Sequence, residues 1–240
     1  MMANGFTEAR STAETLNEVE RRVLGVLIEK ALAQPQYYPM TLNAITAACN
    51  QKSNRDPLLE LDGETIWNTL ELLRAGGLVS RLLPGGAARV ERFKHEAKQF
   101  FGWEKPQRAV LAELLLRGPQ TVGELRTHCS RMYPFENVEA VTAVLESLSQ
   151  GATPRVAVLP RVPGQSAVRY AHRLYPPEEW ARLAAVPAGD APVTPPPAPS
   201  ATAAGELETL RSALEEVRAE VAQLRAALTE LQERVAKLGL

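Results

Sequence analysis

Apolar residues recur at helical spacing in three stretches near the start of the chain. Each stretch follows a residue type that favours a helix N-cap: Asn17, Thr41 and Asp62. These positions predict three helices, the first of them opened by a capping box. Alternating apolar and polar residues then predict two strands, at 78–83 and 89–93, which a Pro-Gly-Gly turn connects.

The same order of elements occurs a second time. The apolar pattern of residues 110–115 repeats that of residues 23–28, and a Pro-x-Thr sequence precedes the next helix in both copies. Two further predicted strands, 156–159 and 168–174, end the second copy. Such self-similarity indicates duplicated structure. Three helices and a hairpin are the layout of a winged helix-turn-helix, so the sequence predicts a mostly α fold with small β-hairpin wings and two tandem winged helix-turn-helix domains.

A region of different composition follows the two copies. Residues 187–205 contain six prolines and predict a semi-rigid linker of polyproline-like form. Residues 1–15 are small, polar and without periodicity, which predicts disorder. The predicted organisation is a disordered N-terminus (1–15), winged-helix domain 1 (16–103), winged-helix domain 2 (104–186), a Pro-rich linker (187–205) and a coiled-coil helix (206–240).

The last segment, residues 206–240, keeps an unbroken 3-4 apolar spacing over five heptads and predicts a coiled coil. Its oligomerisation residues, at positions a and d, are Leu207, Leu210, Leu214, Val217, Val221, Leu224, Leu228, Leu231, Val235 and Leu238. A parallel pair places Glu206 opposite Arg211, whereas an antiparallel pair brings arginines together. We therefore expect a parallel homodimer. A trimer stays open because no polar residue occupies a or d, and the alternative is that the tail folds back on its own domains.

The two copies differ in length at one interval. Seventeen positions separate Cys49 from Ile66, whereas twelve separate Cys129 from Val141, so the first copy has five extra residues. The interval contains the polar sequence NQKSNRDP at 50–57. The packing of the repeat does not require an insertion, and loops often carry binding residues. We therefore expect this loop to lie outside the core and to take part in function.

The composition bounds the class of protein. Of the 240 residues, 45% are apolar and 23% are charged, as in an ordinary globular protein. The net charge of −1 gives no overall electrostatic case for nucleic acid. The N-terminus lacks the apolar segment of a signal peptide, and no apolar run approaches the roughly 20 residues of a membrane helix. The expected setting is soluble, reducing and cytoplasmic.

Residues suited to catalysis or metal binding do not form a recognisable set. Cys49 and Cys129 lie far apart without a CxxC motif, so they predict neither a disulfide nor a zinc site, and both are expected to be small buried residues. His95, His128 and His172 are scattered along the chain. No Gly-rich loop connects a strand to a helix, so no nucleotide site is predicted. We expect no enzymatic activity, no cofactor and no metal.

Five short motifs carry a resemblance to a known family. They are LIEK (27–30), AACN (47–50), CNQKSNRDP (49–57), LLLRGPQTVGELR (114–126) and RMYPF (131–135). Together they resemble the YceH family of uncharacterised bacterial proteins, over about residues 16–175 and into the heptad tail. The resemblance implies a tandem winged-helix fold in a cytosolic protein. The family has no established biochemical activity, so the resemblance transfers no catalytic or binding residue.

The predicted third helix of each copy is acidic. In a helix-turn-helix this helix usually enters the DNA major groove and reads bases with Arg, Lys, Asn or Gln. The acidic residues of the two helices are Asp62, Glu64, Glu71, Glu136, Glu139 and Glu146. Because carboxylates repel phosphates, we expect DNA contact through the third helix to be disfavoured.

Basic and amide residues gather instead in the loop after the second helix and in the first wing. The candidate nucleic-acid contacts are Gln51, Lys52, Asn54, Arg55, Arg81, Arg89, Arg92 and Lys94. The loop combines positive charge with amides that bond bases or backbone. These residues favour a non-enzymatic DNA-binding protein, with regulation as an extension that fold alone does not establish. The competing interpretation is that the loop residues cap helix ends and the wing arginines are solvated edge-strand charges.

A protein-interaction scaffold is the alternative function. Near-neutral charge and acidic third helices favour it, and a coiled coil would supply paired copies and avidity. Trp67, Tyr37, Tyr38 and Tyr133 are candidates for an interface patch. Aromatic residues at these spacings more often belong to the core, so burial of their rings discriminates between the two roles.

Overall fold

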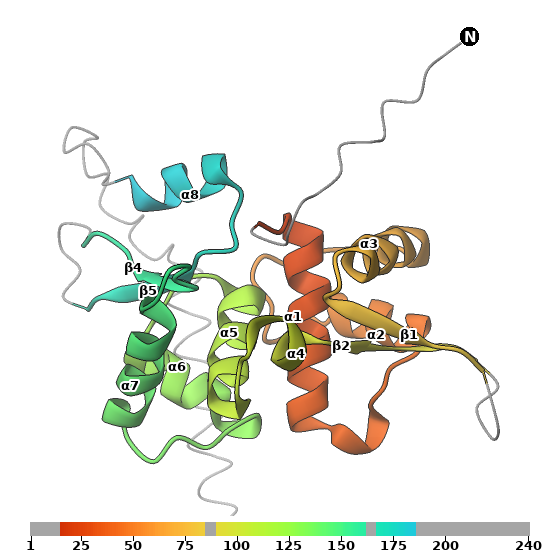
Figure 1. The fold of residues 1–240 in the computed structure, drawn as a ribbon, viewed down its shortest axis with the longest axis horizontal. Coiled ribbons are helices and arrows are strands. Elements are labelled where there is room, and N and C mark those ends of the chain that lie inside the picture. The colour runs from red at the N-terminus through yellow and green to blue at the C-terminus, as the bar shows by residue number, and fades with distance from the viewer. Residues whose placement is uncertain (1–14, 85–89, 162–166, 186–240) are drawn as a thin grey trace, which may run out of the picture. The chain divides into compact units, whose positions relative to one another are not determined.

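The computed structural model describes residues 15–84, 90–161 and 167–185 (Figure 1). All of them belong to one compact unit that spans residues 1–188. The predicted N-terminal disorder up to residue 14, the linker, the coiled coil with its heptad residues and both hairpin turns lie outside the described residues. Those features stay predictions.

Three helices and a hairpin form the first half of the described residues. The elements are α1 (Glu18–Ala33), η1 (Pro35–Tyr37), α2 (Leu42–Cys49), α3 (Gly63–Ala75), β1 (Val79–Leu82) and β2 (Arg92–His95). The predicted helix caps are confirmed, because the side chains of Asn17, Thr41 and Asp62 each accept a hydrogen bond from a backbone N–H of the first turn. These bonds satisfy amides that have no partner within the helix.

The second half repeats this order with additions. Its elements are α4 (Ala97–Phe101), α5 (Lys105–Arg117), β3 (Gln120–Thr121), α6 (Val122–His128), η2 (Cys129–Arg131), α7 (Val138–Ser149), β4 (Val156–Val158), β5 (Arg169–His172) and α8 (Pro177–Ala184). Thr121 and Glu124 form a capping box at the start of α6. The prediction of a mostly helical fold with small antiparallel hairpins is confirmed in this form.

The structure shifts one predicted strand and adds one that the sequence did not predict. The return strand expected at 89–93 is observed from Arg92 to His95, because Phe93 and His95 are both buried on one face of β2. Phe93 also exchanges two backbone hydrogen bonds with Met40, just before α2. In the second half this contact has become the short strand β3, which the sequence did not indicate and which gives a sheet of order β3-β5-β4.

The two hairpins share a buried histidine. His95 pairs with Val79 of β1, and His172 pairs with Val156 of β4. In each, Nδ1 accepts a hydrogen bond of 3.2 Å from the backbone N–H two residues further on. Burial lowers the pKa of His95 to about 4 and holds the pKa of His172 well below its usual value. His95 and His172 are therefore equivalent, neutral residues of the two hairpins.

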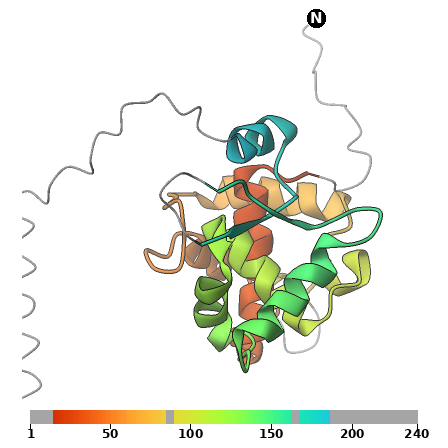
Figure 2. The ribbon, with the colours of Figure 1, turned by 90° about the vertical axis from the view of Figure 1, so that its left-hand side faces the viewer.

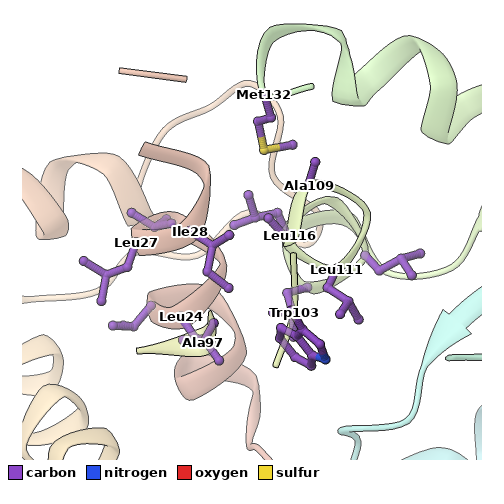
Figure 3. Close-up of a cluster of buried hydrophobic side chains, with 14 of the residues drawn as sticks. Leu24, Leu27, Ile28, Ala97, Trp103, Ala109, Leu111, Leu116 and Met132 are labelled. Carbon is purple, nitrogen blue, oxygen red and sulfur yellow. The ribbon is translucent and has the colours of Figure 1, made fainter. Parts of the chain in front are cut away.

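The two halves share one hydrophobic core, centred on the contact between α1 and α5. Figure 3 shows Ile28 of α1 facing Leu116 of α5, in a cluster that also contains Leu24 and Leu111, and all four side chains are buried. A Cβ atom on Gly25 would lie 3.0 Å from the Leu116 side chain. Because Gly25 has no side chain, the backbone of α1 can approach α5 closely.

We expect Gly25→Val to lower the free energy of unfolding by about 1–3 kcal/mol, because the added methyl groups overpack the contact with Leu116. Urea denaturation followed by circular dichroism measures the change. The matched control is Gly123→Ala, since a Cβ atom at Gly123 would meet nothing within 4 Å. An unchanged denaturation midpoint in Gly25→Val would show that the two helices do not depend on this close approach.

Candidate functional site

The inserted loop, residues 50–57, connects the two halves. At its start, the Asn50 amide donates to the carbonyl of Leu61 at 2.7 Å and accepts from the N–H of the same residue at 2.9 Å. At its other end, the Asp56 N–H donates to the Leu116 carbonyl of α5 at 2.9 Å. The loop therefore bonds to both halves of the described structure.

Arg55 of this loop is buried. Its side chain has no exposed surface and forms an ion pair of 2.6 Å with Glu29 of α1. Its Nε donates to the Ala48 carbonyl at 3.1 Å, and Nη2 also donates to the Gln51 side chain at 3.1 Å. The expectation that the whole loop lies outside the core is wrong at this residue. Arg55 is not available to contact a nucleic acid in this structure.

The candidate cations of the first hairpin are engaged within the protein. Arg81 lies 3.4 Å from Glu71 and 3.7 Å from Glu91, and its guanidinium stands over the Trp67 ring. Lys94 forms an ion pair of 2.9 Å with Glu96. The remaining candidate on this hairpin that the structure describes is Arg92, and Arg89 lies outside the described residues.

Arg92 has a counterpart in the second half. Its Nη1 donates to the carbonyl of Pro39 at 2.7 Å, and Arg169 donates in the same way to the carbonyl of Pro119. Both prolines precede the capping threonine of a helix. The two arginines therefore attach each hairpin to the start of α2 or α6, which is a structural role.

The other three loop candidates are not buried as Arg55 is. Gln51 and Lys52 are exposed, and Lys52 has no acidic partner within the described residues. Asn54 is half-buried and adopts a left-handed backbone conformation with φ of 60°. Asparagine tolerates this region better than most residues, and the Asn54 Oδ1 accepts a hydrogen bond from Arg117 of α5.

Of the four candidate aromatic residues, three pack against the core and one is exposed. Trp67, Tyr38 and Tyr133 pack against the hydrophobic core, and the Tyr38 hydroxyl accepts a hydrogen bond of 2.6 Å from the His95 N–H. Tyr37 is 69% exposed. A common aromatic patch at the surface is therefore not formed by these residues.

An open polar cavity of about 580 Å³ lies beside the loop. Its walls come from the end of α1, the loop, the end of α5 and the α6–η2 segment, so both halves contribute. We refer to it as the inter-half cleft. Lys52 and Asn54 line it from the first half, and Arg117, His128 and Arg131 line it from the second.

A hydrogen-bonded network forms one wall of the inter-half cleft. Arg117 Nε lies 2.9 Å from Glu113 Oε1, and Arg117 Nη1 lies 3.1 Å from His128 Nε2. Arginine can only donate, so His128 Nε2 accepts and the imidazole proton resides on Nδ1. That Nδ1–H donates to the Gln120 side-chain oxygen at 2.6 Å. The network therefore requires the neutral form of His128.

Burial shifts the two titratable groups of this wall in opposite directions. It raises the pKa of Glu113 to about 7, although the neighbouring Arg117 opposes the shift. It lowers the pKa of His128, with the positive charge of Arg117 as a further cause. Near neutral pH, Glu113 is therefore a mixture of its acid and carboxylate forms, while His128 is uncharged.

Sequence reasoning missed this network. Its visible signal was Glu113 and Arg117, four positions apart within the otherwise apolar run AVLAELLLR, a spacing that places both on one helix face. Asn54, Gln120 and His128 reach the same place only through the packing of the two halves. Among the described residues, no group of three or more His, Cys, Asp or Glu is placed to hold a metal ion. No helix in that part of the chain is long and apolar enough to cross a membrane.

Comparison with known proteins gives one consistent match. The family profile described as "Protein of unknown function, DUF480" matches residues 16–165, a range that contains the whole inter-half cleft. A UPF0502 protein of Geotalea daltonii is 50% identical over 182 residues, 72% of this chain and 83% of the relative. A UPF0502 protein of Geobacter metallireducens is 52% identical over 159 residues, 66% of this chain and 72% of the relative. A UPF0502 protein of Geobacter sulfurreducens is 48% identical over 159 residues, 66% of this chain and 72% of the relative.

We expect Arg55→Ala to lower the free energy of unfolding by about 2–4 kcal/mol, because it leaves the mostly buried Glu29 without its nearest cation. Lys52→Ala, in the same loop but exposed, is the control and should change stability by less than about 0.5 kcal/mol. Urea denaturation of both variants measures the difference. Equal stability of the two variants would contradict the structural role of Arg55.

The pH dependence of stability separates Glu113 from the buried histidines. The raised pKa of Glu113 stabilises the fold at low pH, and this contribution is lost as pH rises through about 7. The lowered pKa of His95 acts in the opposite sense, because stability is lost as pH falls from about 6.5 towards 4. We therefore expect Glu113→Gln to lose unfolding free energy more steeply than the parent chain between pH 7 and pH 4.5.

Denaturation midpoints at half-unit pH steps measure this slope. The removed contribution corresponds to roughly 3 kcal/mol over the full window at about 1.36 kcal/mol per pKa unit. Glu139→Gln, at an exposed carboxylate of α7, is the control and should follow the parent chain. Parallel curves for Glu113→Gln and the parent would show that the Glu113 pKa is unshifted.

Proposed function

The chain belongs to the DUF480 family of proteins of unknown function, and we propose that it is a non-enzymatic binding protein built from two winged helix-turn-helix modules. The order of three helices and a hairpin in each half supports this assignment. So do the equivalent positions of His95 and His172 and of Arg92 and Arg169. A tandem winged-helix fold is also what the resemblance to the YceH family implies.

A protein partner is the ligand class that the first hairpin favours. Beyond the helices, the hairpin presents Leu82, Leu83 and Val90, which are 40%, 69% and 53% exposed. Figure 1 shows β1 and β2 running outward from α2 and α3 towards this end. Exposed apolar side chains gathered on one projection are typical of an interaction surface. We propose that an apolar pocket of a partner protein accepts this end of the hairpin.

The charges of the hairpin and of the third helices also favour a protein partner. The hairpin cations Arg81 and Lys94 are neutralised by neighbouring glutamates, so they are poorly placed to replace the counterions of a phosphate backbone. On α3, Asp62 and Glu64 are exposed, and α7 presents Glu139 in the second half. Acidic third helices disfavour a groove of DNA and suit a partner that combines apolar and basic residues.

The absence of catalysis is part of the proposal. Cys49 and Cys129 are both buried, and burial raises the pKa of Cys49 to about 12. The pKa of Cys129 is raised for the same reason. Neither supplies a thiolate nucleophile at neutral pH. In the inter-half cleft, both nitrogens of His128 are engaged with Arg117 and Gln120, which leaves no free nitrogen for general base catalysis.

Nucleic acid is the second candidate, and a different set of cations favours it. Lys52 and Arg131 are exposed, have no acidic partner within the described residues, and border the inter-half cleft from opposite halves. Such a nucleic-acid contact would use these residues and Gln51 in place of the wing residues predicted from the sequence. The coiled coil expected at 206–240 would supply paired copies for either ligand.

We expect Leu82→Ser with Leu83→Ser to reduce capture of the partner at least about tenfold, because each buried leucine side chain contributes roughly 1.5–3 kcal/mol. Affinity capture from a bacterial extract, quantified by mass spectrometry against the parent chain, measures the loss. Leu58→Ser is the control, since Leu58 is 64% exposed but lies outside the hairpin. It should capture the same proteins as the parent.

Fluorescence anisotropy on random duplex DNA between about 50 and 200 mM salt decides between the candidates. Under the protein-partner proposal the parent chain shows no saturable binding at the lowest salt. Binding with a log–log salt slope near −4 or steeper would indicate several phosphate contacts. If Lys52→Ala with Arg131→Ala abolished that binding while the hairpin variant retained it, nucleic acid would be the ligand.

A further inference from the structure

The inter-half cleft has the size and position of a ligand site. Its volume of about 580 Å³ lies in the usual range for small-molecule pockets, roughly 300–1,000 Å³. It opens between two packed halves, where such pockets often occur. Both halves place a basic residue at the equivalent position of their first helix, Lys30 in α1 and Arg117 in α5, and both residues line the cleft.

The cleft carries an excess of positive charge. Among the described lining residues, the cations are Lys30, Lys52, Arg117 and Arg131, and the carboxylates are Glu29 and Glu113. The Glu29 carboxylate is shared by two cations, Arg55 at 2.6 Å behind the wall and Lys30 at 3.5 Å. One negative charge thus faces two positive charges at this point. Protonation of Glu113 near neutral pH increases the excess further.

Several donors in the cleft have no partner. Arg117 Nε forms an ion pair with Glu113 at 2.9 Å without a hydrogen bond, one N–H of Nη1 donates to His128, and one N–H of Nη2 donates to Asn54. Because each terminal nitrogen carries two N–H groups, one on each has no partner in the described part of the chain. Lys52 and Arg131 form no ion pair with any described residue. Unused donors on a guanidinium held by three neighbours are preorganised for an oxyanion.

We infer that the inter-half cleft binds a small multivalent oxyanion, a phosphate- or carboxylate-bearing metabolite, with Arg117 at its base and Lys52 and Arg131 at its two rims. The excess charge attracts the anion, and the planar fork of Arg117 suits the paired oxygens of either group. Contacts from both halves would make the ligand bridge them. The inference does not rest on the protein-partner function proposed above, because the hairpin does not contribute to this site.

Isothermal titration calorimetry of the full chain tests the inference, with inorganic pyrophosphate and citrate as separate probes at constant ionic strength and pH 7.5. We expect saturable binding of at least one probe, with one site per chain and a Kd of about 1 mM or lower. Binding of pyrophosphate alone or citrate alone identifies the preferred group, and binding of both supports the shared oxyanion chemistry. Absence of saturable heat with both probes overturns the inference.

Two pairs of variants locate the binding. Lys52→Ala with Arg131→Ala removes both rim cations, which are exposed, and should weaken the bound probe at least tenfold. Lys105→Ala with Arg161→Ala removes two exposed cations outside the cleft and should leave the Kd within about twofold. Equal weakening by the two pairs would show general charge attraction and overturn the site. Glu113→Gln removes a cleft carboxylate, so it should bind more tightly than the parent at pH 8, and weaker binding would also contradict the inference.

Discussion

The close contact of α1 with α5 holds the two halves of the described structure together, and the rest of the site depends on it. Gly25 lets the two helices approach until the Leu116 side chain lies against the backbone of α1. Their apolar faces then form one core (Figure 3). Figure 2 looks from the side of the second half and shows α1, in red, behind the green helices of that half. Residues at the end of α1 and residues of α6 and η2 line the same cavity, so the polar ends of the helices border the inter-half cleft.

The two copies have kept their framework and changed at their junction. An arginine that attaches each hairpin to the next helix and a histidine that closes each hairpin occur at equivalent positions. These side chains form hydrogen bonds with backbone atoms. A buried polar group left without a hydrogen bond lowers the free energy of unfolding by about 1–3 kcal/mol. The junction differs because only the first copy has the inserted loop, whose Asn54 and Asp56 bond to α5. Two copies are expected to differ at the junction, where each contacts the other half, and to stay alike where each packs only within its own half.

The buried pair of Arg55 and Glu29 explains why one residue of an otherwise largely exposed polar loop was wrongly expected at the surface. Composition shows that the loop carries charge, but charge alone does not show where the partner lies. Glu29 is 26 residues earlier in the chain, on the polar end of an otherwise apolar helix. A buried arginine is stable only when its hydrogen bonds are satisfied, and the carbonyl of Ala48 and the carboxylate of Glu29 do this.

The sequence by itself determined what depends on neighbours along the chain. Helix caps at Asn17, Thr41 and Asp62, the apolar faces and the duplication were predictable because capping and periodicity are local properties. Only the tertiary structure decided which polar residues are free and which are engaged. The cleft network joins Asn54 to Arg117 and His128 across separate elements, and no local rule specifies such contacts. Their geometry follows from the packing of α1 on α5, which aligns groups that lie far apart in sequence.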